Sequence, residues 1–509
     1  MQSPGNVVYY IANYFYLEIT MDQKHIPCPN FRKCGGCQLQ NLPYAEQLLH
    51  KQRRAVSVLG ELGHVENIIG MDEPAHYRNK VHAALAYDRA KNKTISGIYQ
   101  PGSHRIVPVD ECMIEDKLAD EIIVDIRRML PEFKIQVFDE RGGSGWLRHI
   151  LIRRGFATGE VMVVLVAVSP IFKLQKPFLK KLLEKHPEIT TVVLNTNDRF
   201  GPVILGAREK VIYGSGYIED VLCGKRFRIS SRSFYQINPV QTEKLYSAAI
   251  GLAGLTGTET VLDAYCGIGT IGLSASDKAN QVIGVEINRD AVNDAIANAR
   301  LNGVKNCWFT VGDAGKYMEQ MAADKVKPDV VFMDPPRAGS DERFLSSLLK
   351  CAPKRIVYIS CNIDTQRRDL DVLLSGGYKI RRIQPVDMFP YTEHIETVVL
   401  LSHKKPDSVI NVKVEFGEGE GKIPLDNIEK RAESYKPKER VTYKMIKEYI
   451  EEKYGFKVHT AYIAEVKREL GLPMYDAPNA VEELKQPRKH PTTEKVEAIK
   501  DALRYYKVI

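Results

Sequence analysis

Four side chains able to do acid–base or nucleophilic chemistry stand where apolar runs of the sequence end. They are Asp263, Glu286, Asp334 and Cys361, all between residues 258 and 397. The apolar runs alternate with polar segments of helical spacing, which predicts crossover units and a parallel sheet. Ligands of such sheets bind beyond the carboxyl ends of the strands, so we expect these four side chains to share one site.

A Gly-x-Gly-x-x-Gly pattern at 267–272 follows the first of these runs. With Glu286 at about the distance of a ribose-binding acid, it matches the dinucleotide fingerprint, and a nicotinamide enzyme is a rival interpretation. Asp263, however, would repel a pyrophosphate and would attract an ammonium group. The Asp-Pro-Pro turn that starts at Asp334 is also absent from that fingerprint. A ligand with a nucleoside and a cationic amino acid, S-adenosylmethionine, fits better.

Composition places the chain among ordinary globular proteins. Its 509 residues allow two to four domains, and 44% are hydrophobic without any run that approaches a membrane span. The net charge of +8 permits a polyanionic partner. Nine cysteines without a secretory signal predict a cytoplasmic protein, in which thiols serve metals or catalysis.

Four of the cysteines suggest a four-thiolate site. Cys28, Cys34 and Cys37 form a Cys-x5-Cys-x2-Cys cluster, and Cys112 stands alone. Zinc ribbons usually carry two Cys-x2-Cys knuckles, and this region has one. An iron–sulfur cluster, a zinc ion and unligated thiols are the alternatives.

Four motifs together resemble the RNA (uracil-C5)-methyltransferase family over about residues 25 to 402. They are Asp263-Ala-Tyr-Cys-Gly-Ile-Gly, Asp334-Pro-Pro-Arg337, Ser360-Cys361-Asn362 and His394-Ile-Glu396-Thr-Val. The resemblance implies methyl transfer from S-adenosylmethionine to carbon 5 of a uridine. It makes Cys361 the nucleophile and Glu396 the base.

The same resemblance implies the ligand-binding residues. Those expected at the methyl donor are Gln236, Asp263, Tyr265, Gly267, Gly269, Thr270, Glu286, Asp313 and Asp334. Those expected to hold a 4Fe-4S cluster are Cys28, Cys34, Cys37 and Cys112. We interpret the cluster as structural and RNA-orienting, since uracil methylation needs no electron transfer. Its pattern is typical of the branch that acts on 23S ribosomal RNA, so we expect that RNA as the partner of a monomeric protein that binds no membrane.

The chemistry explains why a thiol and a carboxylate are both needed. A thiolate that adds to carbon 6 makes carbon 5 nucleophilic, and a base later removes the carbon 5 proton. A buried structural cysteine, a strand-end glutamate and a helix cap are the ordinary alternatives for Cys361, Glu396 and Asp334. A transfer-RNA uracil methyltransferase and a non-catalytic RNA-binding or assembly factor are the rival functions. Amino-group methylation of adenine ranks lower, because Arg337 stands where that chemistry places an aromatic residue.

The expected fold class is α/β: a Rossmann-like methyltransferase domain preceded by a β-rich central domain with an iron–sulfur loop and followed by a helical C-terminal extension. The corresponding segments are 1–20 (a non-native or disordered start), 21–75 (cysteine-rich segment and helix), 76–232 (β-rich RNA-binding domain), 233–402 (methyltransferase domain) and 403–509 (helical extension). Met21 is the expected natural start. The family's usual N-terminal β-barrel RNA-binding domain has no room in this layout.

The central segment is expected to present a basic face to RNA. Its strands carry Arg78, Lys80, His82, Arg148, His149, Arg153, Arg154, Arg226 and Arg228. Alternation along a strand would place several of them on one exposed face, and scattered surface charge is the alternative. Nearby rings that would stack on bases are Trp146, Phe227, Phe234 and Tyr235.

Two amphipathic segments mark the C-terminal extension. Residues 441–450 and 460–470 both have helical spacing of apolar side chains. They are compatible with a small helix–turn–helix module that contacts RNA or ribosomal protein, and equally with a brace on the catalytic domain.

Overall fold

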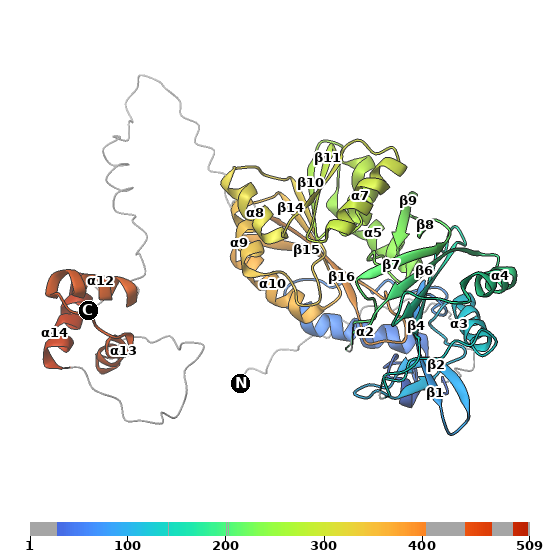
Figure 1. Cartoon of the computed structure of the whole chain (residues 1–509). Coiled ribbons are helices and arrows are strands. Elements are labelled where there is room, and N and C mark those ends of the chain that lie inside the picture. Colours follow the sequence, from blue (N-terminus) through green and yellow to red (C-terminus); the bar gives the residue numbers. More distant parts are fainter. Residues whose placement is uncertain are drawn as a thin grey trace, which may run out of the picture. The chain divides into compact units, whose positions relative to one another are not determined.

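The computed structural model describes residues 28–140, 142–199, 201, 203–403, 443–470 and 492–506. The chain divides into two compact units, residues 1–409 and 410–509, which are considered separately (Figure 1). The expected start segment 1–20, Met21 and the beginning of the C-terminal extension lie outside the described residues.

One seven-stranded sheet of the first unit carries the motifs. Its strand order is β12-β11-β10-β13-β14-β16-β15. The strands are β10 (Thr260–Ala264), β11 (Gln281–Glu286), β12 (Cys307–Val311), β13 (Val330–Met333), β14 (Arg355–Ser360), β15 (Tyr378–Val386) and β16 (Glu396–His403). The predicted parallel pairing is confirmed for β10, β11, β13 and β14, whereas β16 runs antiparallel to both β14 and β15. The strand order reverses at β10, where a parallel sheet opens its ligand crevice.

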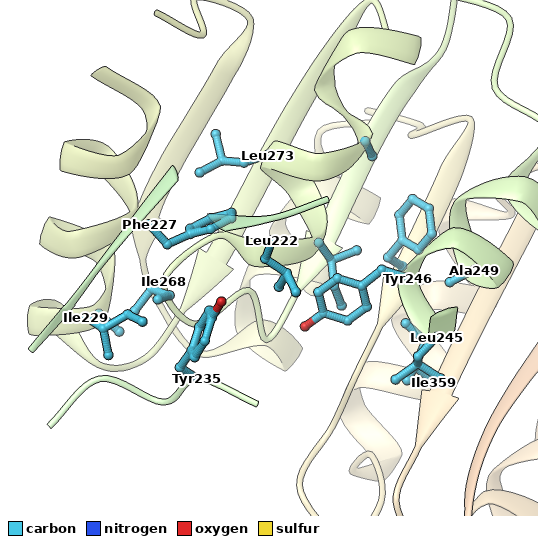
Figure 2. Close-up of a cluster of buried hydrophobic side chains, with 14 of the residues drawn as sticks. Leu222, Phe227, Ile229, Tyr235, Leu245, Tyr246, Ala249, Ile268, Leu273 and Ile359 are labelled. Carbon is cyan, nitrogen blue, oxygen red and sulfur yellow. The ribbon is translucent and has the colours of Figure 1, made fainter. Parts of the chain in front are cut away.

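Helices cover both faces of this sheet. They are α2 (Tyr44–Leu59), α5 (Pro239–Ala253), α6 (Thr270–Ala275), η1 (Ser276–Lys278), α7 (Arg289–Leu301), α8 (Ala314–Ala323), α9 (Glu342–Cys351) and α10 (Ile363–Ser375). Alternate strand residues enter two different cores, since Phe332 packs with α5, α6 and α7, and Val331 packs with α2, α8, α9 and α10. Figure 2 shows part of the first core, where Tyr246 and Leu245 of α5 lie near Ile359 of β14.

A second seven-stranded sheet has the order β3-β2-β1-β4-β5-β6-β7. Its strands are β1 (Lys80–Asp88), β2 (Lys93–Tyr99), β3 (Ile106–Pro108), β4 (Leu147–Arg154), β5 (Val161–Ala167), β6 (Ile189–Thr196) and β7 (Arg208–Tyr213). The helices α1 (Phe31–Cys34), α3 (Lys117–Met129) and α4 (Gln175–Lys185) and the hairpin of β8 (Tyr217–Leu222) and β9 (Lys225–Ser230) complete this part. Only β5 and β6 pair in parallel in this sheet as described, and α4 connects them.

The prediction of an exposed basic face is wrong for β4. Arg148, His149 and Arg153 are all buried. Both faces of this strand are covered, so alternation cannot bring a side chain to solvent. The two arginines instead satisfy backbone carbonyls: Arg148 donates to Arg199 (2.6 Å) and Arg153 to Ser233 (2.6 Å). Arg148 and Arg153 therefore stabilise the fold through these hydrogen bonds.

The expected stacking rings divide in the same way. Phe227 and Tyr235 belong to the core in Figure 2 and are buried, so their prediction as RNA contacts is wrong. Trp146 is half-buried and packs against Phe172. Phe234 is 69% exposed and keeps a ring available to solvent.

A buried ion pair joins α2 to the loop between β15 and β16. Lys51 Nζ lies 2.5 Å from Asp387 Oδ1, and both side chains have no solvent exposure. Lys51 also donates to the carbonyl of Phe389 (3.0 Å), and the Tyr44 hydroxyl donates to Asp387 Oδ2 (2.8 Å). Each charge therefore has several polar partners, which is the condition under which a buried pair is tolerated.

The second unit contains three helices around a small apolar core. They are α12 (Tyr443–Tyr454), α13 (Thr460–Glu469) and α14 (Thr493–Tyr505). The first two were predicted from spacing, and α14 was missed although Ile499 and Leu503 have the same helical separation. No helix in the described ranges has the length and apolar character needed to cross a bilayer.

Replacing Lys51 with methionine should destabilise the protein strongly, because Asp387 would remain buried without its counter-charge. The expected loss in free energy of unfolding is about 3–5 kcal/mol. The matched control is Arg54→Met in the same helix, where the exposed pair with Asp364 should contribute at most about 1 kcal/mol. Urea denaturation monitored by circular dichroism measures both. Equal midpoints for the two variants would contradict the role given to the buried pair.

Candidate active site

The thiol and the carboxylate predicted to do the chemistry lie on neighbouring strands. Ser360 at the end of β14 pairs with Thr397 in β16. Because the strands are antiparallel, the next opposed positions are Cys361 and Glu396. Opposed residues in such a pair have Cβ atoms about 4.5–5.5 Å apart. The register thus joins two residues that the sequence separates by a helix and a strand.

Asp334 completes this group from the other side of β14. It follows β13, which pairs in parallel with β14, so their carboxyl ends meet at the same sheet edge. Its negative charge raises the pKa values of both Cys361 and Glu396, which reflects its proximity to each. The reading of Asp334 as a helix cap is wrong, since Asp341 caps the helix that follows.

Burial favours the protonated forms of Cys361, Glu396 and Asp334. It raises the pKa of Cys361 to about 11, with further contributions from Glu396 and Asp334. Burial also raises the pKa of Glu396 well above its ordinary value and that of Asp334 to about 7. The Arg337 guanidinium opposes these shifts at Cys361 and Glu396. A further positive charge in the site would favour the ionised forms.

The loop of Arg337 is bound to the turn that carries Cys361. Asn362 caps α10 by accepting from the amide of Asp364 (3.1 Å), and its Nδ2 donates to the carbonyl of Arg337 (3.1 Å). The Arg337 side chain contacts His394 Nδ1 at 2.8 Å. Arg337 and His394 received no role from the sequence, although both stand within the quoted motifs. Their contact links the loops that precede α9 and β16.

The glycine turn after β10 is braced by two acids. The amide of Gly272 donates to Asp263 Oδ2 (2.8 Å), and the amide of Gly267 donates to Glu286 Oε2 (3.2 Å). Gly269 has a φ of 83°, a left-handed conformation that favours glycine. Asp263 is buried and its Oδ1 has no hydrogen-bond partner. Asp263 therefore shapes the turn and leaves one acceptor unsatisfied.

The remaining residues expected at the methyl donor have the following positions. Tyr265 follows β10 and its hydroxyl lies 3.4 Å from Ser340 Oγ. Thr270 Oγ1 lies 3.0 Å from the hydroxyl of Tyr246 in α5. Gln236 precedes α5, which begins at the predicted cap Asn238. Asp313 caps α8 by accepting from the amide of Lys316 (3.0 Å), so this carboxylate has a structural partner.

The charges of this edge suit a cationic ligand. Burial, with smaller contributions from the charges of Asp334 and Glu286, raises the pKa of Asp263 to about 7. A ligand that brings a sulfonium and an ammonium group would relieve the repulsion among these carboxylates. The unsatisfied Oδ1 of Asp263 and this acidic group are thus compatible with the donor set expected for S-adenosylmethionine.

The four cysteines expected to hold a cluster are reduced and partly buried. Burial raises the pKa of Cys34 and Cys37, and the charge of Cys28 raises both further, so these three are neighbours. Cys37 and Cys112 pack against the same apolar cluster. Within the described ranges, however, no three acidic, histidine or cysteine side chains are arranged closely enough to hold a metal ion.

The cysteine segments are nevertheless joined by one side chain. Gln40 accepts from the amide of Cys28 (2.8 Å) and donates to the sulfur of Met113 (3.3 Å), next to Cys112. The segments that carry Cys28 and Cys112 are therefore held next to each other.

Comparison with known proteins agrees with this geometry. Residues 202–404 match the family model described as tRNA (Uracil-5-)-methyltransferase. An uncharacterized RNA methyltransferase of Halalkalibacterium halodurans is 44% identical over 76% of this chain and 85% of its own length. One from Clostridium acetobutylicum is 43% identical over 76% and 85% of the two chains.

A solved structure is similar as well. It is Pyrococcus abyssi tRNA (uracil-54, C5)-methyltransferase in complex with S-adenosyl-L-homocysteine, with a TM-score of 0.61 and 29% identity. The match covers 72% of this chain and 85% of that one. Sheet order, strand-end acids and these similarities lead to one conclusion: the chain belongs to the RNA (uracil-C5)-methyltransferase family and is a SAM-dependent RNA methyltransferase.

Proposed function

We propose that this protein methylates carbon 5 of a uridine in 23S ribosomal RNA, with Cys361 as nucleophile and Glu396 as base. One observation carries the proposal: the register of β14 and β16 brings Cys361, just after β14, opposite Glu396 at the start of β16, and the charge of Glu396 raises the pKa of Cys361. Neither a structural cysteine nor an RNA-binding role alone requires that pairing.

The proposed reaction uses each group once. The Cys361 sulfur bonds to carbon 6 of the uracil, and the electron pair of the 5,6 double bond moves into the ring as an enolate. The electron pair of the enolate then forms a bond from carbon 5 to the methyl group of S-adenosylmethionine, and S-adenosyl-L-homocysteine leaves. Glu396 removes the proton from carbon 5, the bond between sulfur and carbon 6 breaks, and the double bond is restored.

The protonation of the resting site sets the order of these events. Burial raises the pKa of both Cys361 and Glu396, which favours their protonated forms before the substrates bind. A cationic donor beside Asp334 would lower the pKa of both groups, and the protons that they lose would pass to water. The positive charge of Arg337 also lowers the pKa of Cys361 and of Glu396.

Two classes of RNA, ribosomal RNA and transfer RNA, are candidate substrates. The four cysteines support ribosomal RNA through the family resemblance, whereas the similar Pyrococcus abyssi protein is named for transfer RNA. Transfer RNA is therefore the second candidate. In either RNA the target uridine must leave its stack, which is easiest in a single-stranded loop.

Methyl transfer from labelled S-adenosylmethionine to 23S ribosomal RNA should be lost in Cys361→Ala. The assay compares unmodified 23S RNA with unmodified transfer RNA, followed by mass mapping of the labelled nucleotide. Cys351→Ala is the matched control. This thiol is at the end of α9 and is buried in the core, so its removal should leave methyl transfer intact. Label in transfer RNA alone would select the second candidate, and activity in Cys361→Ala would reject the mechanism.

Glu396→Gln should trap a covalent protein–RNA adduct. The amide cannot remove the carbon 5 proton, so the sulfur–carbon bond persists after methyl transfer. The adduct should appear as a slow band on denaturing gels when donor and RNA are both present. Glu393→Gln, three residues earlier, should turn over without accumulating it. A Glu396→Gln variant that shows no adduct and normal turnover would remove Glu396 from the base role.

We also propose that Cys28, Cys34, Cys37 and Cys112 hold a 4Fe-4S cluster that fixes the loop around them. The support is the family resemblance, the proximity of Cys28, Cys34 and Cys37, and the bridge that Gln40 forms from Cys28 to Met113. Protein purified without oxygen should contain about four irons and four sulfides per chain, and Cys112→Ser should lower both. Cys223→Ser, outside this region, is the control. Bound zinc without sulfide would overturn the iron–sulfur assignment.

A further inference from the structure

Arg337 and His394 lie in the loops that lead into α9 and β16, and their side chains meet at 2.8 Å. Neither residue forms or breaks a bond in the proposed reaction. Arg337 nevertheless follows Asp334 by three residues, and His394 precedes Glu396 by two. The contact therefore joins two segments that each carry a group of the candidate active site.

The backbone of Arg337 is held by the first turn of α10. Its carbonyl accepts from Asn362 Nδ2 and from Thr365 Oγ1, both at 3.1 Å. Farther along the same loop, Gly339 has a φ of 78°, and a side chain at that position would collide with the Arg368 guanidinium. The main chain of this loop is therefore fixed against α10.

The side chain of Arg337 is restrained much less. Among the described residues, its one hydrogen-bond partner is His394 Nδ1, and none of their carboxylates forms an ion pair with it. Both residues are exposed, so packing contributes little to holding the guanidinium. A free arginine side chain has many rotamers. The place of its charge therefore depends on His394.

The direction of this hydrogen bond follows from the chemistry of the two groups. A guanidinium has only donors, so His394 Nδ1 accepts and the ring carries its proton on Nε2. Burial lowers the pKa of His394, and the charges of Arg337 and Lys51 lower it further. The charge of Arg78 acts in the same direction, and that of Glu393 opposes it. The ring is therefore neutral at neutral pH, which leaves Nδ1 able to accept.

The His394 ring is supported by the loop between β15 and β16. It meets the Phe389 ring edge to face, with ring centroids 6.1 Å apart. The carbonyl of Phe389 accepts from Lys51 Nζ (3.0 Å) and from Thr392 Oγ1 (2.8 Å). Because the Lys51 side chain has no solvent exposure, the acceptor for Arg337 is anchored in the protein interior.

We propose that His394 is a positioning residue: by accepting a hydrogen bond from Arg337, it holds the guanidinium beside Cys361 and Glu396. The positive charge there stabilises the thiolate that adds to the uracil and the carboxylate that removes the proton. The charge of Arg337 lowers the pKa of both groups, which agrees with this placement. The inference rests on the proposed function for the roles of Cys361 and Glu396.

The first test measures the reactivity of Cys361 in the full-length protein without donor or RNA. Iodoacetamide alkylates the thiolate, and mass spectrometry of the Cys361 peptide gives the rate at a fixed pH below the pKa. His394→Leu should slow alkylation about tenfold, because the guanidinium moves away and fewer sulfurs are ionised. His394→Asn places an amide oxygen where Nδ1 was and should react as the wild type does. Arg337→Met should be as slow as His394→Leu, and the double variant should be no slower.

The second test is single-turnover methyl transfer to whichever of the two RNA classes the wild type labels. His394→Leu should lower the rate about 10- to 150-fold, as for the loss of one hydrogen bond to a charged group. His394→Asn should restore most of it. His64→Leu, at an exposed position between α2 and β1, is the matched control and should keep the wild-type rate. Calorimetric binding of S-adenosyl-L-homocysteine should be equal in all variants, which excludes a general loss of fold.

Alkylation of His394→Leu at the wild-type rate or faster would overturn the positioning role, as would a His394→Asn variant as slow as His394→Leu. A further slowing when His394→Leu is added to Arg337→Met would also overturn it. Because alkylation needs neither donor nor RNA, it separates the two claims. The expected pattern of alkylation in a protein whose methyl transfer survives Cys361→Ala would leave the positioning of Arg337 standing and reject the proposed function.

Discussion

The buried pair of Lys51 and Asp387 fixes the loop on which the proposed chemistry depends. Asp387 directly follows β15, and the loop from it ends at Glu396, the first residue of β16. Around the pair, the amide of Leu39 donates to the carbonyl of Tyr391 (2.9 Å), and Gln47 accepts from the Tyr391 amide (2.9 Å). Two buried charges are stable only while these partners surround them, so the position of the loop is determined cooperatively.

This arrangement connects the cysteine segment with the methyltransferase sheet. Cys37 packs against the cluster that includes Tyr391, and Tyr77 donates its hydroxyl to the carbonyl of Pro390 (3.0 Å). The segment that carries the thiols thus contacts the loop that leads to Glu396.

The sequence was sufficient to predict where a side chain lies when its position depends only on the strand that carries it. A strand-end acid or thiol lies at the ligand edge of any parallel sheet, so Asp334 and Cys361 were predictable from their runs alone. The register that opposes Glu396 to Cys361 comes from an antiparallel strand that no local signal predicted. Arg148 was misplaced for a related reason, because alternation cannot reveal that both faces of β4 are covered.

The raised pKa of Cys361 also bears on how long the protein survives in an oxidising environment. With a pKa raised to about 11, the sulfur is protonated at neutral pH, and the thiolate is the form that peroxides and alkylating agents attack. The Cys361 thiol is therefore shielded from these reagents by its own proton. Any charge that ionises this sulfur would at the same time make it sensitive to oxidation.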